Sequence, residues 1–191
     1  KNHIKTIIKS KDINYVELGY WKQTSKSTNP YYNMDEKFLN ILSNSKSLFK
    51  KISLMVDCHY CSHNPNDYPS KNEYGIGLFR VCSRSEDIDK ATKLGESIKN
   101  RTGSKLSMNF FNITNYSDKD LKECIQKASD AGADFIYLAD THGTLDLINE
   151  FEKYSNLAKM IKEKNIIPGF HLHDHSGKAY MNFRLLPYVG F

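Results

Sequence analysis

Two apolar runs and the segment between them decide the fold. Residues 135–139 read Phe-Ile-Tyr-Leu-Ala, and residues 166–171 read Ile-Ile-Pro-Gly-Phe-His. Each run has the length of a typical strand. Between them, apolar residues recur every three or four positions, as one face of a helix requires: Leu147, Phe151, Tyr154, Leu157 and Ile161. The stretch therefore predicts a strand, a helix and a second strand.

The same alternation extends toward the N-terminus. Four further strand-length runs cover residues 13–19, 52–56, 76–81 and 106–113, with segments of helical period between them. Six strands alternating with helices predict right-handed crossovers and a parallel α/β sheet. An open doubly wound sheet and a closed barrel both fit this alternation, but no Gly-x-Gly-x-x-Gly follows a strand, which argues against a dinucleotide-binding fold.

Local signals agree with these helices. Ser117, with Asp120 three residues later, is typical of a capping box at a helix start. Gly103 and Gly132 follow helical segments, where a left-handed residue commonly ends a helix. We find no linker or internal repeat, so residues 1–191 are predicted to form a single domain.

Composition narrows the class of protein. The 191 residues are 39% hydrophobic and 26% charged, as in a soluble globular domain. The net charge is +5, but the basic residues are scattered among acids, which disfavours a nucleic-acid partner. No apolar run approaches the roughly 20 residues that span a membrane. The four cysteines form no secretory framework, so we expect a cytoplasmic protein. The chain lacks an initiator Met and is compatible with a piece of a longer protein.

Polar residues gather after the predicted strands, where parallel α/β folds place functional groups. His171 and His173 are the sharpest of these signals. Residues two apart in a strand point to the same side, so both imidazoles can face one divalent metal. The alternative is a histidine pair that binds nothing, which the position at the end of a buried strand disfavours.

Other candidates carry two interpretations each. Asp140 and Thr141 either contact a metal ligand and a substrate or cap a helix that begins near Leu145. Glu17 lies among apolar residues, where an unpaired carboxylate is costly, so it needs an arginine or a ligand as partner. Arg80 is the matching cation, and a Glu17–Arg80 pair inside the barrel is the alternative to a substrate role.

The spacing Cys58-x-x-Cys61, with nearby histidines, also suggests zinc. A structural zinc site usually needs a second pair of ligands, and the sequence has no second Cys pair, which disfavours zinc there.

At several of these positions the chain resembles a known family. Residues 16–20 (Val-Glu-Leu-Gly-Tyr), 80–82 (Arg-Val-Cys), 137–143 (Tyr-Leu-Ala-Asp-Thr-His-Gly) and 169–182 (Gly-Phe-His-Leu-His-Asp-His-Ser-Gly-Lys-Ala-Tyr-Met-Asn) occur in the order seen in hydroxymethylglutaryl-CoA lyase-like barrels. The nearest branch is the 4-hydroxy-2-oxovalerate aldolases, whose sixth strand ends in Asp-Ser-x-Gly. Thr141 replaces that serine and keeps its hydroxyl.

The resemblance implies a parallel (β/α)₈ TIM barrel that is incomplete here, with the six predicted strands matching strands two to seven. It implies that His171 and His173 bind manganese or magnesium and that Thr141 contacts a 2-oxo acid. The metal would stabilise a pyruvate enolate as a carbon–carbon bond of a 4-hydroxy-2-oxo acid breaks or forms. His171, Arg80 and Glu17 join Thr141 as candidate substrate-binding residues.

One departure from the family matters. The family's first strand carries an Arg-Asp pair, in which Asp is the third metal ligand and Arg stabilises the enolate. This sequence contains no Arg-Asp dipeptide. No catalytic residue is therefore assigned within these 191 residues, and we expect the chain alone to be inactive.

Three functions remain open on this reasoning. The first is a metal-dependent aldolase or lyase. The second is an acyl-CoA-dependent 2-oxo acid synthase of the isopropylmalate or homocitrate type. The third is a barrel remnant without catalysis. The expected partner is a small 2-oxo acid, with no nucleic acid or membrane, and a homo-oligomer is compatible with the sequence.

Overall fold

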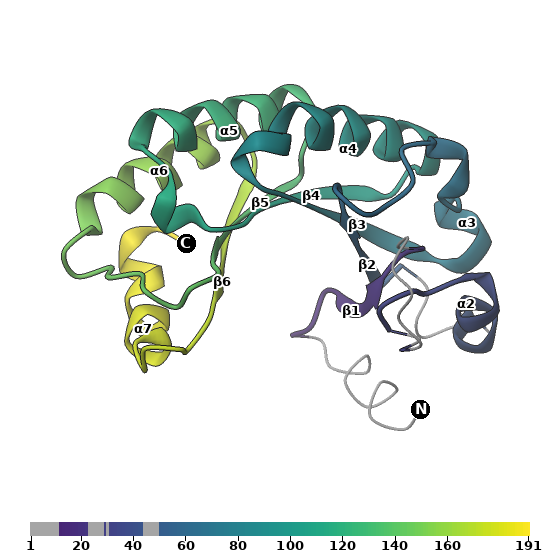
Figure 1. Ribbon diagram of the computed structural model, residues 1–191, viewed down its shortest axis with the longest axis horizontal. Helices are drawn as coiled ribbons and strands as arrows, with labels where there is room; N and C mark the ends of the chain where they lie inside the picture. Colours follow the sequence, from purple (N-terminus) through teal and green to yellow (C-terminus); the bar gives the residue numbers. More distant parts are fainter. Residues whose placement is uncertain (1–11, 23–28, 30, 44–49) are drawn as a thin grey trace. The chain divides into compact units, whose positions relative to one another are not determined.

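A computed structural model describes residues 12–22, 29, 31–43 and 50–191 of the chain; within 36–43, the side chains of 38 and 41–43 are not described. The strands follow one another as β1-β2-β3-β4-β5-β6 in a six-stranded sheet (Figure 1). Their bounds are Val16–Tyr20 (β1), Ile52–Asp57 (β2), Ile76–Ser83 (β3), Lys105–Phe110 (β4), Phe135–Asp140 (β5) and Ile167–Leu172 (β6). The pairs β1–β2, β2–β3, β4–β5 and β5–β6 are parallel. The predicted fold class, an incomplete α/β TIM barrel, is confirmed.

Helices connect the strands, as the 3.6-residue period predicts. They are Glu36–Ser43 (α2), Lys71–Tyr74 (α3), Ile88–Thr102 (α4), Asp118–Asp130 (α5), Phe151–Glu163 (α6) and Ala179–Val189 (α7). Short 3₁₀ turns follow three strands, at Pro65–Asp67 (η2), Ser85–Asp87 (η3) and Ile113–Asn115 (η4). The sequence also predicts the end of a helix at residues 4–9, which lie outside the described residues. Among the described residues, no helix is long and apolar enough to cross a membrane.

The chain divides into two compact units. The N-terminal unit comprises residues 1–82 and 93–106, and the C-terminal unit comprises residues 83–92 and 107–191. The N-terminal unit holds β1, β2 and nearly all of β3. The C-terminal unit holds most of β4, with β5, β6 and helices α5 to α7, and α6 contacts α5, α7 and β6.

Strand register sorts the side chains of each unit onto two faces. In the C-terminal unit, Asn109 pairs with Tyr137 and Tyr137 with Gly169, so these three share one face. Ala139 pairs with His171 two residues further along, which places His171 on that same face. Met108, Ile136 and their alternating neighbours face the other way and are fully buried. The polar face of this sheet is thus the one that carries His171.

Close packing on the polar face depends on Gly169. A Cβ atom at this position would lie 2.6 Å from the ring of Tyr137. The glycine therefore lets the Tyr137 ring lie flat against β6, beside the histidine strand end.

Helix α5 begins as the sequence predicts. Ser117 accepts a hydrogen bond from the backbone N–H of Asp120 at 3.2 Å, and the Asp120 carboxylate accepts one from the Ser117 N–H at 3.1 Å. This is a capping box, and the buried face behind it carries Leu121 and Ile125. The predicted left-handed glycines at the helix ends, Gly103 and Gly132, are also observed.

Replacing Ser117 with alanine is expected to lower the free energy of unfolding by about 1 kcal/mol, because the cap loses its side-chain acceptor. The Ser117 hydrogen bonds also lower the pKa of Asp120. A lowered folded-state pKa means that the stabilisation is present above the unfolded pKa and is lost as pH falls through the folded one. Urea denaturation followed by circular dichroism should therefore show a lower free energy of unfolding for Ser117→Ala than for wild type at pH 7. This difference between the two proteins should become smaller in acid. An equal difference at both pH values would contradict this account.

One expected helix start is wrong. The sequence predicts a helix beginning near Leu145, but residues 144–146 are irregular, residues 147–150 form turns, and α6 begins at Phe151. The reason is tertiary. The Asn182 side chain of α7 donates to the Leu145 carbonyl and accepts from the Leu147 N–H, which takes these backbone groups out of a helical ladder. Leu147 is still fully buried, so its apolar character is explained by the turn that it anchors.

Candidate active site

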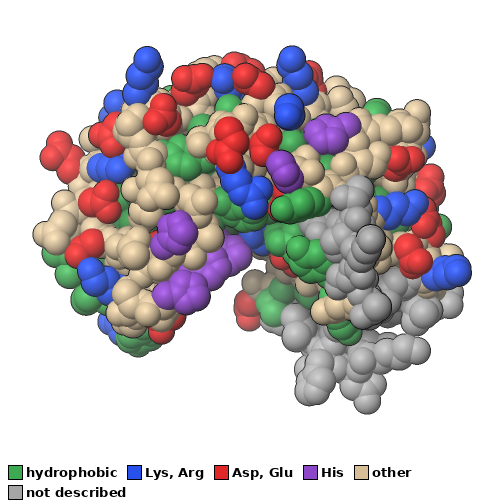
Figure 2. Space-filling model, viewed as in Figure 1, with side chains coloured by type: hydrophobic (Ala, Val, Ile, Leu, Met, Phe, Trp, Pro, Cys, Tyr) green, Lys and Arg blue, Asp and Glu red, His purple; other side chains and the backbone are tan. Residues whose placement is uncertain are grey.

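The two predicted metal ligands lie side by side in the C-terminal unit. The imidazole rings of His171 and His173 are stacked, with centroids 4.7 Å apart and planes 17° from parallel. His175 continues the stack, 5.6 Å from His173. Figure 2 shows histidine side chains gathered on one part of this unit's surface. Both His171 and His173 are half-buried, so they are open to a small ligand.

A backbone contact orients His173. Its Nδ1 atom lies 2.8 Å from the carbonyl oxygen of Asp140. A carbonyl can only accept, so this contact places the proton of a neutral imidazole on Nδ1 and leaves the lone pair on Nε2. Histidine ligands of metals are commonly fixed in this way by a hydrogen bond on the second ring nitrogen.

The Asp140 carboxylate holds the turn that follows β5. It accepts hydrogen bonds from the backbone N–H groups of Thr144, at 3.0 Å, and Leu145, at 3.1 Å. Asp140 is only 1% exposed, so these bonds compensate a buried charge. The Asp140 carboxylate therefore holds a turn and does not cap a helix, while the Asp140 carbonyl orients His173.

The loop after β6 packs closely on the loop after β5. Gly143 adopts a left-handed conformation, and a Cβ atom there would lie 2.8 Å from the backbone nitrogen of His175. The Ser176 hydroxyl donates to the carbonyl of Gly143. Only glycine fits at position 143, and the contact holds the loop after β6, which carries His173 and His175, against the turn that follows Asp140.

Thr141 lies at the same strand end. Its Oγ1 atom accepts a hydrogen bond from the backbone N–H of Asn112 at 2.9 Å, which joins the end of β5 to the loop after β4. The side chain is half-buried. Thr141, His171 and His173 therefore all lie at the carboxyl ends of β5 and β6, with His171 inside β6 and the other two just after the strands.

Glu17 and Arg80 form an ion pair in the N-terminal unit. Arg80 Nη1 donates to Glu17 Oε2 at 2.8 Å, and the two side chains are 14% and 31% exposed, respectively. Arg80 pairs in register with Met55, and Glu17 with Ser53, so both project from the same face of the strands. Burial raises the pKa of Glu17, while Arg80 lowers it less strongly. Each side chain thus has the protein partner that the sequence reasoning required.

Replacing Glu17 with alanine is expected to lower the free energy of unfolding by about 2 kcal/mol, because the largely buried Arg80 loses a charged acceptor. Glu17→Gln should cost less, because the glutamine amide oxygen can still accept the hydrogen bond from Arg80. The single tryptophan, Trp21, is 1% exposed in the same unit, so its fluorescence can follow urea unfolding. A larger decrease in the free energy of unfolding for Glu17→Gln than for Glu17→Ala would contradict this interpretation.

Cys58 and Cys61 are both buried as free thiols. The Nε2 atom of His63 lies 2.9 Å from the Cys58 carbonyl oxygen, so this histidine contacts the backbone. In the part of the chain that the structure describes, no group of three or more His, Cys, Asp or Glu side chains is arranged to hold a metal.

Two residues of this site, Ser176 and Asn182, were not singled out by the sequence reasoning. Asn182 is 2% exposed and Ser176 exposed, yet both serve to hold backbone. A polar residue on the buried side of an otherwise apolar segment, as Asn182 is in α7, was the available signal.

Comparison with known proteins gives one family. The HMGL-like family model matches residues 79–185, which is more than half of the chain. The comparison with curated protein sequences found no match.

Solved structures share the fold. The N-terminal domain of a putative aldolase from Bacteroides vulgatus is similar with a TM-score of 0.65 and 21% identity, over 93% of this chain and 58% of that one. The carboxyl transferase domain (Y628A) of Rhizobium etli pyruvate carboxylase with pyruvate has a TM-score of 0.60 and 19% identity, over 83% of this chain and 28% of that one. The same domain with 3-hydroxypyruvate has a TM-score of 0.53 and 19% identity, over 73% and 26%. The chain thus spans little more than half of the first of these structures.

Proposed function

Because the chain belongs to the HMGL-like family, we propose that it forms part of a metal-dependent lyase acting on 4-hydroxy-2-oxo acids. The observation that carries the proposal is the His171–His173 pair, with Nδ1 of His173 at the Asp140 carbonyl and Nε2 directed elsewhere. The relatives solved with pyruvate and 3-hydroxypyruvate make 2-oxo acids the first substrates to test.

The donor set fits a divalent first-row metal. Neutral imidazoles suit iron, zinc and nickel, and two of them leave positions open for substrate oxygens and a carboxylate, which are the ligands that manganese and magnesium prefer. Lone pairs lie in the ring plane, and the two planes are nearly parallel. Rotation of one imidazole about its side-chain torsions would bring both nitrogens onto one ion. Bound there, manganese or magnesium would supply positive charge beside the substrate carbonyl.

The chain's own residues would orient the substrate. With Thr141 Oγ1 accepting from the Asn112 N–H, the Thr141 hydroxyl keeps its hydrogen to donate to a carboxylate or carbonyl oxygen of the 2-oxo acid. The Asp140 turn and the Gly143 contact hold the backbone of the segment after β6, so the chain that carries His173 is fixed in place before substrate arrives. Glu17 and Arg80 remain candidate substrate contacts, with their mutual ion pair as the competing role.

The test is pyruvate release from 4-hydroxy-2-oxo acids of varied chain length by the intact protein that contains this chain. Activity that needs Mn²⁺ or Mg²⁺ and stops with EDTA is the expected result. EDTA-resistant cleavage would contradict the metal role. Release of free CoA thiol from acetyl-CoA with a 2-oxo acid, without aldol cleavage, would instead identify an acyltransferase.

A further inference from the structure

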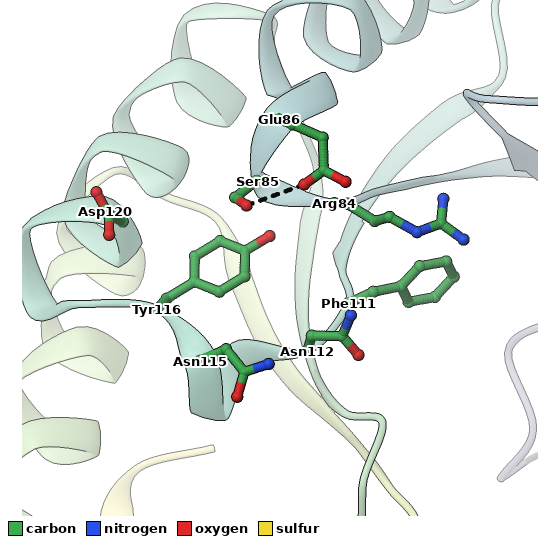
Figure 3. Close-up of a pocket in the computed structure, with 8 residues that line it drawn as sticks. All are labelled: Arg84, Ser85, Glu86, Phe111, Asn112, Asn115, Tyr116 and Asp120. Carbon is green, nitrogen blue, oxygen red and sulfur yellow. Dashed lines mark hydrogen bonds between the residues drawn. The ribbon is translucent and has the colours of Figure 1, made fainter.

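A cavity of about 200 Å³ lies within the C-terminal unit, where β3 and β4 end (Figure 3). Its wall includes Arg84 and Glu86 from the segment after β3, and Phe111, Asn112, Tyr116 and Asp120 from the segment after β4. None of these side chains is used by the proposed metal chemistry. The carboxyl ends of parallel strands are where such folds bind ligands.

Asn112 presents an acceptor to this cavity. Its backbone adopts the left-handed conformation, with φ at 57°, and its N–H is engaged by Thr141. The side-chain oxygen, Oδ1, is buried and finds no hydrogen-bond partner among the described residues. A buried acceptor without a partner costs free energy, so this oxygen favours a ligand that donates a hydrogen bond.

Tyr116 presents a donor. Its side chain is 7% exposed, and its hydroxyl has no hydrogen bond of good geometry within the described structure. Burial raises the pKa of Tyr116 strongly, and the nearby Ser85 hydroxyl offsets this only in part. The phenol therefore keeps its proton and can donate it to a ligand oxygen. Figure 3 shows the Tyr116 hydroxyl directed toward the segment that carries Ser85 and Arg84.

The charged groups on the wall have both signs. The Arg84 guanidinium lies 5.9 Å from the centre of the Phe111 ring, so the cation lies beside an apolar surface. Glu86 accepts a hydrogen bond from Ser85 at 3.1 Å, and Asp120 accepts from Ser117 at 2.7 Å. One cation and two carboxylates suit neither a simple anion nor a simple cation. A ligand that carries both charges fits better.

We propose that this cavity binds a small free α-amino acid. The carboxylate lies toward Arg84 and the Tyr116 hydroxyl, and the ammonium lies toward Asn112 Oδ1 and Glu86. The volume of the cavity fits a ligand of this small size, since about 200 Å³ is below the roughly 300–1,000 Å³ of pockets that bind drug-sized molecules. The site is independent of the metal pair, so its test does not depend on lyase activity.

Three probes of similar size separate the recognised groups. L-serine has a carboxylate and an ammonium, glycerate lacks the ammonium, and ethanolamine lacks the carboxylate. Calorimetric titration of the 191-residue chain, and of the intact protein, should show serine binding at least about 10-fold more tightly than either analogue, which is about 1.4 kcal/mol. Absence of serine binding, or equal affinity for glycerate or ethanolamine, would overturn the proposal.

Two variants and a control locate the site. Arg84→Gln removes the cation, and Asn112→Gly removes the acceptor while tolerating the left-handed backbone. Each should weaken serine binding about 10-fold, whereas Arg101→Gln, an exposed change at the end of α4, should not. Should a variant not fold, amide chemical shifts of the wild-type chain decide the matter. Serine should move the signals of residues 84–86 and 111–116, and shifts confined to other residues would refute the assignment.

Discussion

Replacing His171 with alanine is expected to lower kcat/KM for Mn²⁺-supported pyruvate release by at least about 10²-fold in the intact protein. Loss of an orienting group beyond the ligands commonly costs 10–100-fold in metal affinity or activity, so loss of a ligand should cost at least as much. His173→Ala should lower kcat/KM by a similar factor, because the two rings lie side by side and are proposed to bind the same metal.

The matched control is His142→Ala. His142 is an exposed histidine of the same loop region, two residues after Asp140, and is not part of the proposed ligand pair. It should retain kcat/KM within about 2-fold of wild type, as expected for surface changes. Excess Mn²⁺ should partly restore the activity of the His171→Ala and His173→Ala variants, because their main defect is expected to be weaker metal binding. Full activity of both variants at limiting Mn²⁺ would contradict the assignment.

Replacing Asp140 with alanine is expected to destabilise the C-terminal unit by about 3 kcal/mol. Two backbone N–H groups, of Thr144 and Leu145, donate to this buried carboxylate, and bonds to a charged group are each worth about 1.5–3 kcal/mol. For a chain of this size that loss lowers the melting temperature by roughly 6–12 °C. Differential scanning calorimetry measures it.

Glu152→Ala provides the comparison for Asp140. Glu152 is an exposed acid in the first turn of α6, so its removal should change stability by less than about 0.5 kcal/mol. Asp140→Ala should also weaken Mn²⁺ binding, because the same turn carries the carbonyl that orients His173. An Asp140 variant as stable as the Glu152 variant would show that the turn is held by other contacts.

Periodicity alone located the strands within a few residues. The run at residues 106–113 was predicted as one strand, whereas β4 ends at Phe110 and Asn112 turns into the left-handed region. Asparagine tolerates that conformation, but nothing in a window of apolar residues reveals that the chain must turn there. Strand existence follows from local pattern, while a strand's end depends on the neighbouring loop.

Helix α7 shows more clearly what the sequence pattern cannot predict. Its sequence, residues 179–189, is apolar on most sides and contains Pro187, which disfavours a helix interior. Several of its large apolar side chains, including Tyr180, Phe183 and Tyr188, are exposed. Its register is set by the Asn182 contacts with residues 145 and 147, which are tertiary and have no sequence period.

Some features of the candidate site could be predicted from the sequence, and others depend on tertiary contacts. The His-x-His spacing predicted that both rings share a side, and the rings do stack. The carbonyl contact of His173 could not be predicted, because every residue has a carbonyl and only the fold selects that of Asp140. The Glu17–Arg80 pair was foreseen from the cost of burying lone charges, which requires a partner but does not choose between protein and ligand.

The most direct test of the account is pulsed electron paramagnetic resonance of Mn²⁺ bound to the intact protein with ¹⁵N-labelled histidine. We predict hyperfine coupling to two imidazole nitrogens in the wild-type protein, and to one nitrogen in His171→Ala or His173→Ala. Absence of imidazole coupling in the wild-type protein, or an unchanged spectrum in both variants, would contradict a metal-dependent lyase built on this histidine pair.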